Sequence, residues 1–134
     1  MNTDDSHNPR RFPTTRMRRL RYHPRVRAMA RDVALAPGDL ILPLFVREGK
    51  NVRQPIASMP GHAQISPDLL EEEIREAEKL GLAGVILFGI PSEKDATGSD
   101  SYSDTGIIQQ AIRAAKSAAR ELLVITDVCF CEYT

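Results

Sequence analysis

The 134-residue sequence predicts an α/β fold in which amphipathic helices alternate with the strands of a parallel sheet. Three apolar runs have the length of strands, and each of the two segments between them contains apolar residues at helical spacing. The order strand, helix, strand, helix, strand is typical of right-handed βαβ units. Hydrophobic residues make up 42% of the chain and charged residues 27%, so its composition argues against disorder throughout.

The first predicted strand is the apolar run Leu40–Val46, which follows the turn residues Pro37, Gly38 and Asp39. Because the run is apolar throughout, we expect a strand that is buried on both faces. Pro43 cannot donate a ladder hydrogen bond, so it predicts a distortion or a locally unpaired position. Residues 47–65 follow as a polar connection.

The first long helix has clear signals at both ends. Ser66 suits the N-cap, Pro67 suits the first helical position, and Gly81 suits the position just after the C-cap. Acidic residues in the first turn complement the positive end of the helix dipole. At spacings of three and four, the predicted apolar face contains Leu70, Ile74, Ala77 and Leu80.

The second predicted strand is the continuous apolar run 84–90, which suits a parallel strand covered on both faces. A polar loop, residues 92–105, leads to a second helix, and residues 122–131 form the third predicted strand. The apolar face of the second helix is predicted to contain Ile108, Ile112, Ala115 and Ala119.

A net charge of zero conceals a strong division along the chain. Residues 1–31 contain nine arginines and two acids, a net charge of +7, so the remainder carries −7. We therefore predict a basic N-terminal arm at residues 1–36, with one turn of helix around residues 24–30, and a folded body at residues 37–134. Such an arm suits either a nucleic acid or the acidic body of a neighbouring subunit.

Sequence patterns also bear on the location of the protein. The apolar runs are too short to span a bilayer, and the first eight residues lack the apolar stretch of a secretory signal. Two cysteines only two positions apart do not form a disulfide framework, which favours reduced thiols. We therefore expect a cytoplasmic protein without a membrane partner.

The sequence stops three residues after Cys131, with no helix to cover the third strand. Natural sheets avoid an unprotected strand edge. We therefore expect this chain to be the N-terminal fragment of a longer one.

Candidate chemistry is concentrated in the third predicted strand. If this strand is regular, Ile125, Asp127, Cys129 and Cys131 share one face. Catalytic groups gather at the C-terminal ends of parallel strands, and two thiolates there can bind Zn²⁺ while Asp127 orients a zinc-bound water or acts in proton transfer. The alternative is that both cysteines are buried apolar side chains, with Asp127 hydrogen-bonded to a loop.

The segment Thr126–Thr134, TDVCFCEYT, resembles the zinc-site segment of the porphobilinogen synthase (delta-aminolevulinic acid dehydratase) family. Further matches occur in the order found in that family and extend over the chain from about residue 10. These matching stretches are Arg18–Arg21, Leu42–Val46, Ser58–Gly61, Leu87–Ile90 and Thr97–Asp100.

The resemblance implies a TIM (β/α)₈ barrel, of which this chain supplies about three βα units, and an arm that contacts a neighbour in a homo-octamer. It implies condensation of two 5-aminolevulinate molecules to porphobilinogen, with loss of two waters, for haem and other tetrapyrroles. Cys129 and Cys131 would be Zn²⁺ ligands and Asp127 an active-site carboxylate, and Mg²⁺ is left open as a further ion in the full-length enzyme.

By the same resemblance, a third cysteine ligand and two active-site lysines lie beyond Thr134, so we expect this chain alone to be inactive. Lys50, Lys79, Lys94 and Lys116 are interpreted as solvated, and His7, His23 and His62 as exposed or structural. The sequence leaves two alternatives to an enzyme fragment. One is a nucleic-acid-binding module that uses the arginine-rich arm, which the acidic body disfavours, and the other is a small metal-binding protein that uses the cysteine pair.

Overall fold

The computed structural model describes residues 12, 13 and 15–134, and the chain divides into two units, Met1–Leu35 and Ala36–Thr134. In the first unit, α1 (Pro24–Met29) is the only helix among the described residues. The Nδ1 atom of His23 accepts a hydrogen bond from the Arg25 N–H at 3.2 Å and so caps this helix. The predicted turn of helix around residues 24–30 is therefore confirmed.

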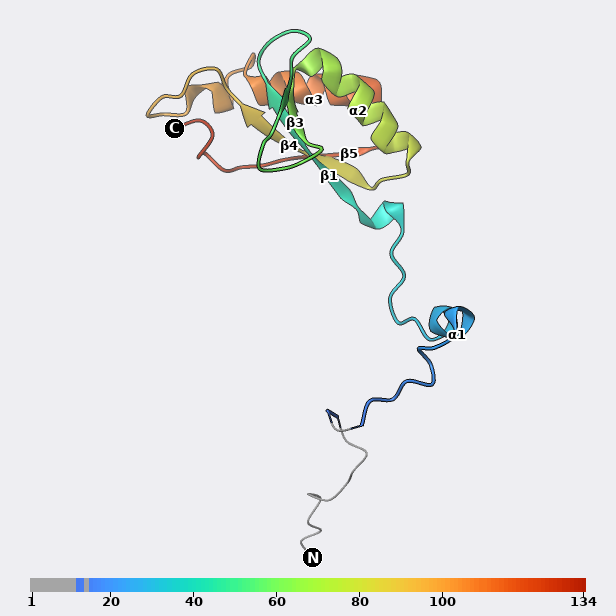
Figure 1. Cartoon of the computed structure of the whole chain (residues 1–134). Coiled ribbons are helices and arrows are strands. Elements are labelled where there is room, and N and C mark those ends of the chain that lie inside the picture. The colour runs from blue at the N-terminus through green and yellow to red at the C-terminus, as the bar shows by residue number, and fades with distance from the viewer. Residues whose placement is uncertain (1–11, 14) are drawn as a thin grey trace, which may run out of the picture. The chain divides into compact units, whose positions relative to one another are not determined.

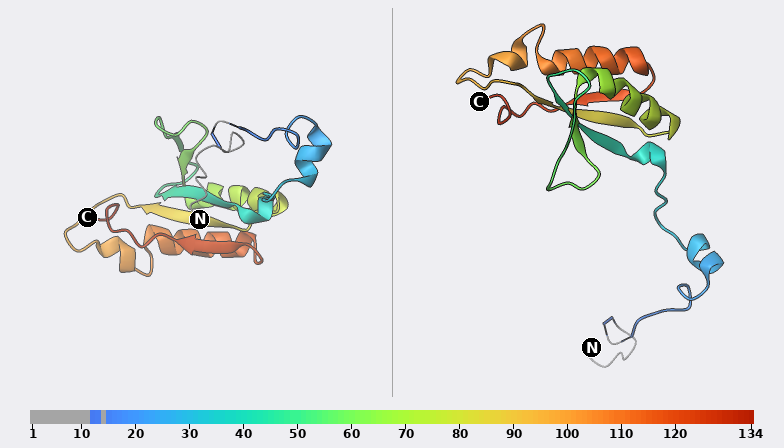
Figure 2. Two further views of the ribbon diagram at one scale, coloured as in Figure 1. Left: turned by 90° about the horizontal axis from the view of Figure 1, so that it is seen from below. Right: turned by 45° about the horizontal axis from the view of Figure 1, so that its top comes forward.

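The second unit is a sheet with two long helices, α2 (Pro67–Lys79) and α3 (Ile107–Ala118), on one face (Figures 1 and 2). Its strands are β1 (Ile41–Arg47), β2 (Arg53–Pro55), β3 (Ala63–Ile65), β4 (Gly84–Ile90) and β5 (Leu123–Thr126). They lie in the order β2-β3-β1-β4-β5, and β1 pairs in parallel with β3 and β4, as β4 does with β5. Two 3₁₀ turns, η2 (Pro37–Asp39) and η3 (Ser99–Tyr102), complete the described elements. The predicted alternation of strands and helices is confirmed.

The prediction that residues 47–65 form only a connection was wrong. They contain β2 and β3, which pair with each other antiparallel, and β3 extends the sheet beside Phe45 and Val46. Each of these strands has three residues and little apolar character, so neither has a detectable period. Their pairing comes from neighbouring strands rather than from their own sequence.

Pro43 lies within β1 without breaking it. The ladder between β1 and β4 runs through Pro43, which is paired with Ile86. On the other side of β1, β3 pairs only with Phe45 and Val46, so the edge at Pro43 has no paired strand there. The predicted unpaired position is confirmed, and the sheet tolerates a residue that lacks an N–H.

The core lies between the helices and one face of the sheet. Leu44, Val46, Val85 and Leu87 point from the strands into this layer, where Leu70 and Ile74 of α2 are fully buried. From α3, the buried residues are Ile107, Ile108, Ala111 and Ala115. The apolar faces predicted for the two helices are therefore largely confirmed.

The sequence prediction extended the core too far in two places. Leu80 is 57% exposed because α2 ends at Lys79, where Leu80 forms the C-cap and Gly81 follows with a φ of 75°. The strands are also not buried on both faces, since Phe45 and Phe88 on the other face are only partly covered. Both helices lie on the same side, and no helix of the second unit covers the opposite one.

Ser66 occupies the predicted N-cap position, but its hydroxyl does not bond to the backbone of α2. It is completely buried, and its hydroxyl accepts a hydrogen bond from the Val52 N–H at 2.9 Å instead of capping α2. We expect Ser66→Ala to destabilise the fold by about 1–3 kcal/mol, because the Val52 N–H loses its acceptor. Urea unfolding measures this effect, with exposed Ser117→Ala, whose hydroxyl contacts only its own helix, as the control. Equal stability of the two variants would contradict the expectation.

Among the described residues, no helix combines the length and apolar character that a membrane-spanning segment requires.

Candidate functional site

The two cysteines follow β5 but do not lie in it. This strand ends at Thr126, and the Asp127 N–H continues the ladder by one hydrogen bond to the Leu87 carbonyl at 3.3 Å. Residues 127–130 are irregular and residues 131–133 form a turn. The predicted strand over residues 122–131 is therefore wrong beyond Thr126, and strand alternation does not position the cysteines.

Exposure of the neighbouring apolar residues supports this correction. Val128 is 85% exposed and Phe130 is 55% exposed, although a regular strand would place both on the face opposite Cys129 and Cys131, where apolar residues suit packing under helices. Because the chain leaves the sheet after Thr126, these side chains lie outside the buried layer between sheet and helices that contains Val85 and Leu87. The segment after β5 is thus shaped by contacts other than strand pairing.

The thiols of Cys129 and Cys131 nevertheless come together. A hydrogen bond with Cys129 raises the pKa of the Cys131 thiol above its ordinary value, and the Coulombic interaction with Cys129 acts in the same direction. Both cysteines are free and exposed, so burial for packing does not explain them. The geometry favours a pair of sulfur atoms available to a ligand.

This donor set fits a soft metal ion in part. Thiolate sulfur suits zinc and other thiophilic metals, and a metal bound by both sulfurs would displace the proton of each thiol. Within the described part of the chain, no group of three or more His, Cys, Asp or Glu side chains is arranged to hold a metal. The described residues thus offer two sulfur ligands and need a further ligand from elsewhere.

Asp127 lies at the edge of the sheet from which the two-cysteine segment departs. It is partly buried, and its N–H bond to Leu87 fixes its backbone to the end of the β4–β5 ladder. Its negative charge contributes to raising the pKa of Tyr133, after the larger effects of burial and of Asp100. Asp127 therefore acts electrostatically on the same small region as the cysteines.

A loop between β4 and α3 lies against this region, and sequence reasoning did not assign it a role. Its Lys94 Nζ donates a hydrogen bond to the Cys131 carbonyl at 2.7 Å. Lys94 and Lys116 are exposed, as expected, but each also donates to a carbonyl, since Lys116 Nζ donates to the Leu122 carbonyl at 3.1 Å. No local pattern could reveal the first contact, because its partners are 37 residues apart.

The loop owes its shape to the Asp95 carboxylate. This group accepts hydrogen bonds from the N–H and hydroxyl of Thr97, at 2.8 and 2.7 Å, and from the N–H and hydroxyl of Ser99. These donors stabilise the ionised form and hold the pKa of Asp95 well below its ordinary value, the Ser99 hydroxyl having the largest effect. Asp95 therefore organises residues 95–99 into a compact turn.

The predicted histidines have structural surroundings where they are described. His23 caps α1, and the ring of His62 makes an edge contact with Phe45, with ring centroids 6.5 Å apart. His7 lies outside the described residues. Neither described histidine contributes to the region around the cysteines.

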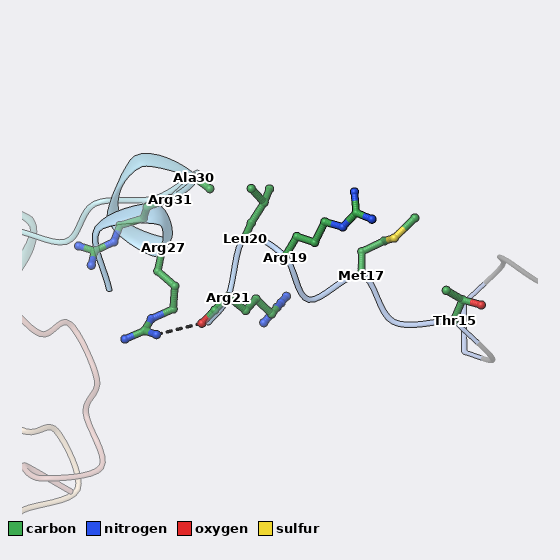
Figure 3. A pocket seen from close by; sticks show the side chains of 8 residues that line it. All are labelled: Thr15, Met17, Arg19, Leu20, Arg21, Arg27, Ala30 and Arg31. Atoms are coloured by element: carbon green, nitrogen blue, oxygen red, sulfur yellow. Dashed lines mark hydrogen bonds between the residues drawn. The ribbon is translucent and has the colours of Figure 1, made fainter. Parts of the chain in front are cut away.

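The first unit, which carries the arginines, has a pocket of its own, shown in Figure 3. Four of its eight lining side chains are arginines, and Arg27 Nη1 donates to the Arg21 carbonyl at 2.9 Å. The lining residues are Thr15, Met17, Arg19, Leu20, Arg21, Arg27, Ala30 and Arg31. This concentration of guanidinium groups favours an acidic partner.

Comparison with known proteins gives a consistent result. The family model of delta-aminolevulinic acid dehydratase matches residues 14–134. The relative from Halalkalibacterium halodurans, a delta-aminolevulinic acid dehydratase, is 49% identical over 119 residues, covering 89% of this chain and 36% of the relative. The corresponding protein of Methanothermus sociabilis is 43% identical over 124 residues, covering 92% and 38%. The chain thus spans little more than a third of the length of these relatives.

A solved structure agrees with this match. The delta-aminolevulinic acid dehydratase (porphobilinogen synthase) of Toxoplasma gondii, in complex with the reaction product porphobilinogen, superimposes with a TM-score of 0.82 at 33% identity. The superposition covers 90% of this chain and 34% of the other. The parallel sheet with its helices is therefore part of a TIM (β/α)₈ barrel, as expected from the sequence. On the combined evidence of the family model, the relatives and the fold, this chain belongs to the delta-aminolevulinic acid dehydratase family.

Proposed function

We propose that this chain is part of an enzyme that condenses two 5-aminolevulinate molecules into porphobilinogen, with loss of two waters. The family match over residues 14–134 carries this proposal, and the Toxoplasma relative with bound porphobilinogen supports the choice of product. Because the chain spans just over a third of its relatives, the activity belongs to a longer polypeptide that completes the barrel.

In this proposal, Cys129 and Cys131 hold Zn²⁺ together with a third ligand that the described residues do not supply. The exposed thiols and the hydrogen bond between them support the assignment, since two adjacent sulfurs match the preference of this metal. When bound, the metal would supply Lewis-acid polarisation of a substrate oxygen. Any contribution of Mg²⁺ would come from sites other than this pair.

Asp127 is proposed to hold or transfer a proton at its carboxylate. Its place at the C-terminal end of a parallel strand supports this role, because barrel enzymes bind substrate at that end. Partial burial restricts the carboxylate while leaving it accessible to a substrate group. The residue would act beside the two cysteines without being a ligand itself.

For the first unit, we propose a role in subunit contacts. The nine arginines within residues 1–31 and the arginine-lined pocket suit an acidic surface, and the remainder of the chain carries a net charge of −7. Residues 1–36 would then be an arm that contacts a neighbouring subunit in a homo-octamer, and residues 37–134 the partial barrel. Reduced thiols at the metal site would suit a cytoplasmic location.

The direct test supplies 5-aminolevulinate to the protein translated from the reading frame extended past Thr134. We expect the extended protein to form porphobilinogen, detected as its coloured adduct with an aromatic aldehyde. The 134-residue chain, prepared in parallel, is expected to form none because it contains only part of the barrel. An extended, folded protein that binds zinc but forms no porphobilinogen would contradict the proposed function.

A further inference from the structure

The segment that carries both cysteines needs a support other than the sheet. Beyond the Asp127 N–H, the bonds that its N–H groups donate are local, with the N–H groups of Tyr133 and Thr134 donating to the Phe130 carbonyl at 2.9 and 3.1 Å. We call residues 127–134 the thiol segment. Its local turn sets the shape of the segment, but contacts with other parts of the chain must set its position.

Two successive residues of the β4–α3 loop, residues 91–106, bind the thiol segment at both ends of its turn. Lys94 Nζ donates to the Cys131 carbonyl at 2.7 Å, and the Asp95 N–H donates to the Tyr133 carbonyl at 3.1 Å. In Figure 1 this loop and the C-terminal segment lie on the same side of the unit. The backbone carbonyl of Cys131 is therefore held by a charged donor.

The loop can impose this position because it is itself ordered by Asp95. The carboxylate of this residue accepts bonds from Thr97 and Ser99, and its carbonyl accepts the Gly98 N–H at 3.1 Å. Asp95 thus links the two structures, since its side chain shapes the loop while its N–H holds the thiol segment.

Close packing supports the same docking. The Tyr133 side chain is only 7% exposed, and a Cβ placed on Gly89 of β4 would lie 2.5 Å from its hydroxyl oxygen. A Cβ on Gly98 of the loop would lie 3.3 Å from both the Phe130 ring and the Tyr133 Cβ. A side chain on Gly89 would therefore require Tyr133 to shift, and one on Gly98 would press on Phe130 and Tyr133.

We propose that Lys94 and Asp95 are positioning residues for Cys129 and Cys131, with the β4–α3 loop holding the two thiols in the arrangement that binds the metal. The inference rests on the proposed metal-binding role of the cysteines and extends it to residues that touch neither sulfur. Residues that orient metal ligands raise the affinity of a site, because ligands that must first be ordered bind the metal more weakly.

The test measures metal affinity in the extended protein. We expect Lys94→Met to weaken Zn²⁺ binding about tenfold, measured by competition with a chromophoric chelator, while the melting temperature is unchanged. With Co²⁺ in place of Zn²⁺, the sulfur-to-metal absorption band should lose intensity or shift. Lys94→Arg should restore both readouts, because a guanidinium also donates to the Cys131 carbonyl.

Two matched controls separate positioning from general effects of charge. Lys79→Met makes the same change at an exposed lysine at the end of α2 and should leave the affinity unaltered. Asp95→Ala should weaken zinc binding as Lys94→Met does, whereas Asp104→Ala, an exposed aspartate of the same loop, should not. Asp95→Asn keeps one accepting oxygen and should fall between Asp95→Ala and the unaltered protein.

The outcomes distinguish this inference from the function on which it rests. Unchanged affinity and Co²⁺ spectrum in Lys94→Met and Asp95→Ala, with loss of metal in Cys131→Ala, would overturn the positioning role alone. Retention of metal by Cys131→Ala would overturn both the metal role of the pair and the positioning role. Weakened binding in the two loop variants, with rescue by arginine, would support the proposal.

Discussion

Replacing Cys129 by alanine in the extended protein is expected to lower its Zn²⁺ affinity by more than about 100-fold, a larger effect than that of losing a residue outside the ligand set. The cause is the loss of one of the two sulfur donors that this chain contributes, which leaves Cys131 without its partner. Porphobilinogen formation should fall in parallel at limiting zinc. Chelator competition and a product assay on the same preparation measure the two effects.

A neighbouring substitution provides the control. Val128→Ala alters an exposed apolar residue of the same segment and should leave both zinc affinity and product formation near those of the unaltered protein. Cys131→Ala should reproduce the effect of Cys129→Ala, because the two thiols act as a pair. Normal zinc stoichiometry and activity in either cysteine variant would show that the pair is not the metal site.

A second large effect is expected in the core. Leu87 is completely buried at the centre of β4, on the face covered by the helices. Leu87→Ala should lower the free energy of unfolding by about 2–5 kcal/mol, because it removes buried methyl groups and leaves a cavity that the close-packed layer fills poorly. Urea unfolding followed by circular dichroism measures the loss.

The matched control is Leu123→Ala in the adjacent strand β5. Leu123 is 60% exposed, and its Cβ, which approaches Gly84 closely, is kept in alanine. Its effect should be about 0.5 kcal/mol or less. Similar losses in the two variants would mean that the face shared by Leu87 and Val85 is not the core of the folded protein.

Local signals account for the elements that were predicted well. Ser66, Pro67 and Gly81 predict a helix from the steric and capping preferences of single residues, and α2 runs from Pro67 to Lys79. The run 84–90 is a strand with the predicted bounds. Ser66 itself shows the limit of this reasoning, because its hydroxyl binds Val52, a residue from a part of the chain that has no recognisable pattern.

The sequence alone was sufficient for the alternation of strands and helices, the division of charge, the family resemblance and the choice of Asp127, Cys129 and Cys131 as candidates. These features depend on residue types and spacings within short windows. Only the tertiary structure decided that β5 stops at Thr126, that both thiols are exposed, and that Lys94 and Asp95 hold the thiol segment. Those outcomes depend on contacts between residues far apart in the chain, where partner and distance are set by folding and leave no periodic trace in the sequence.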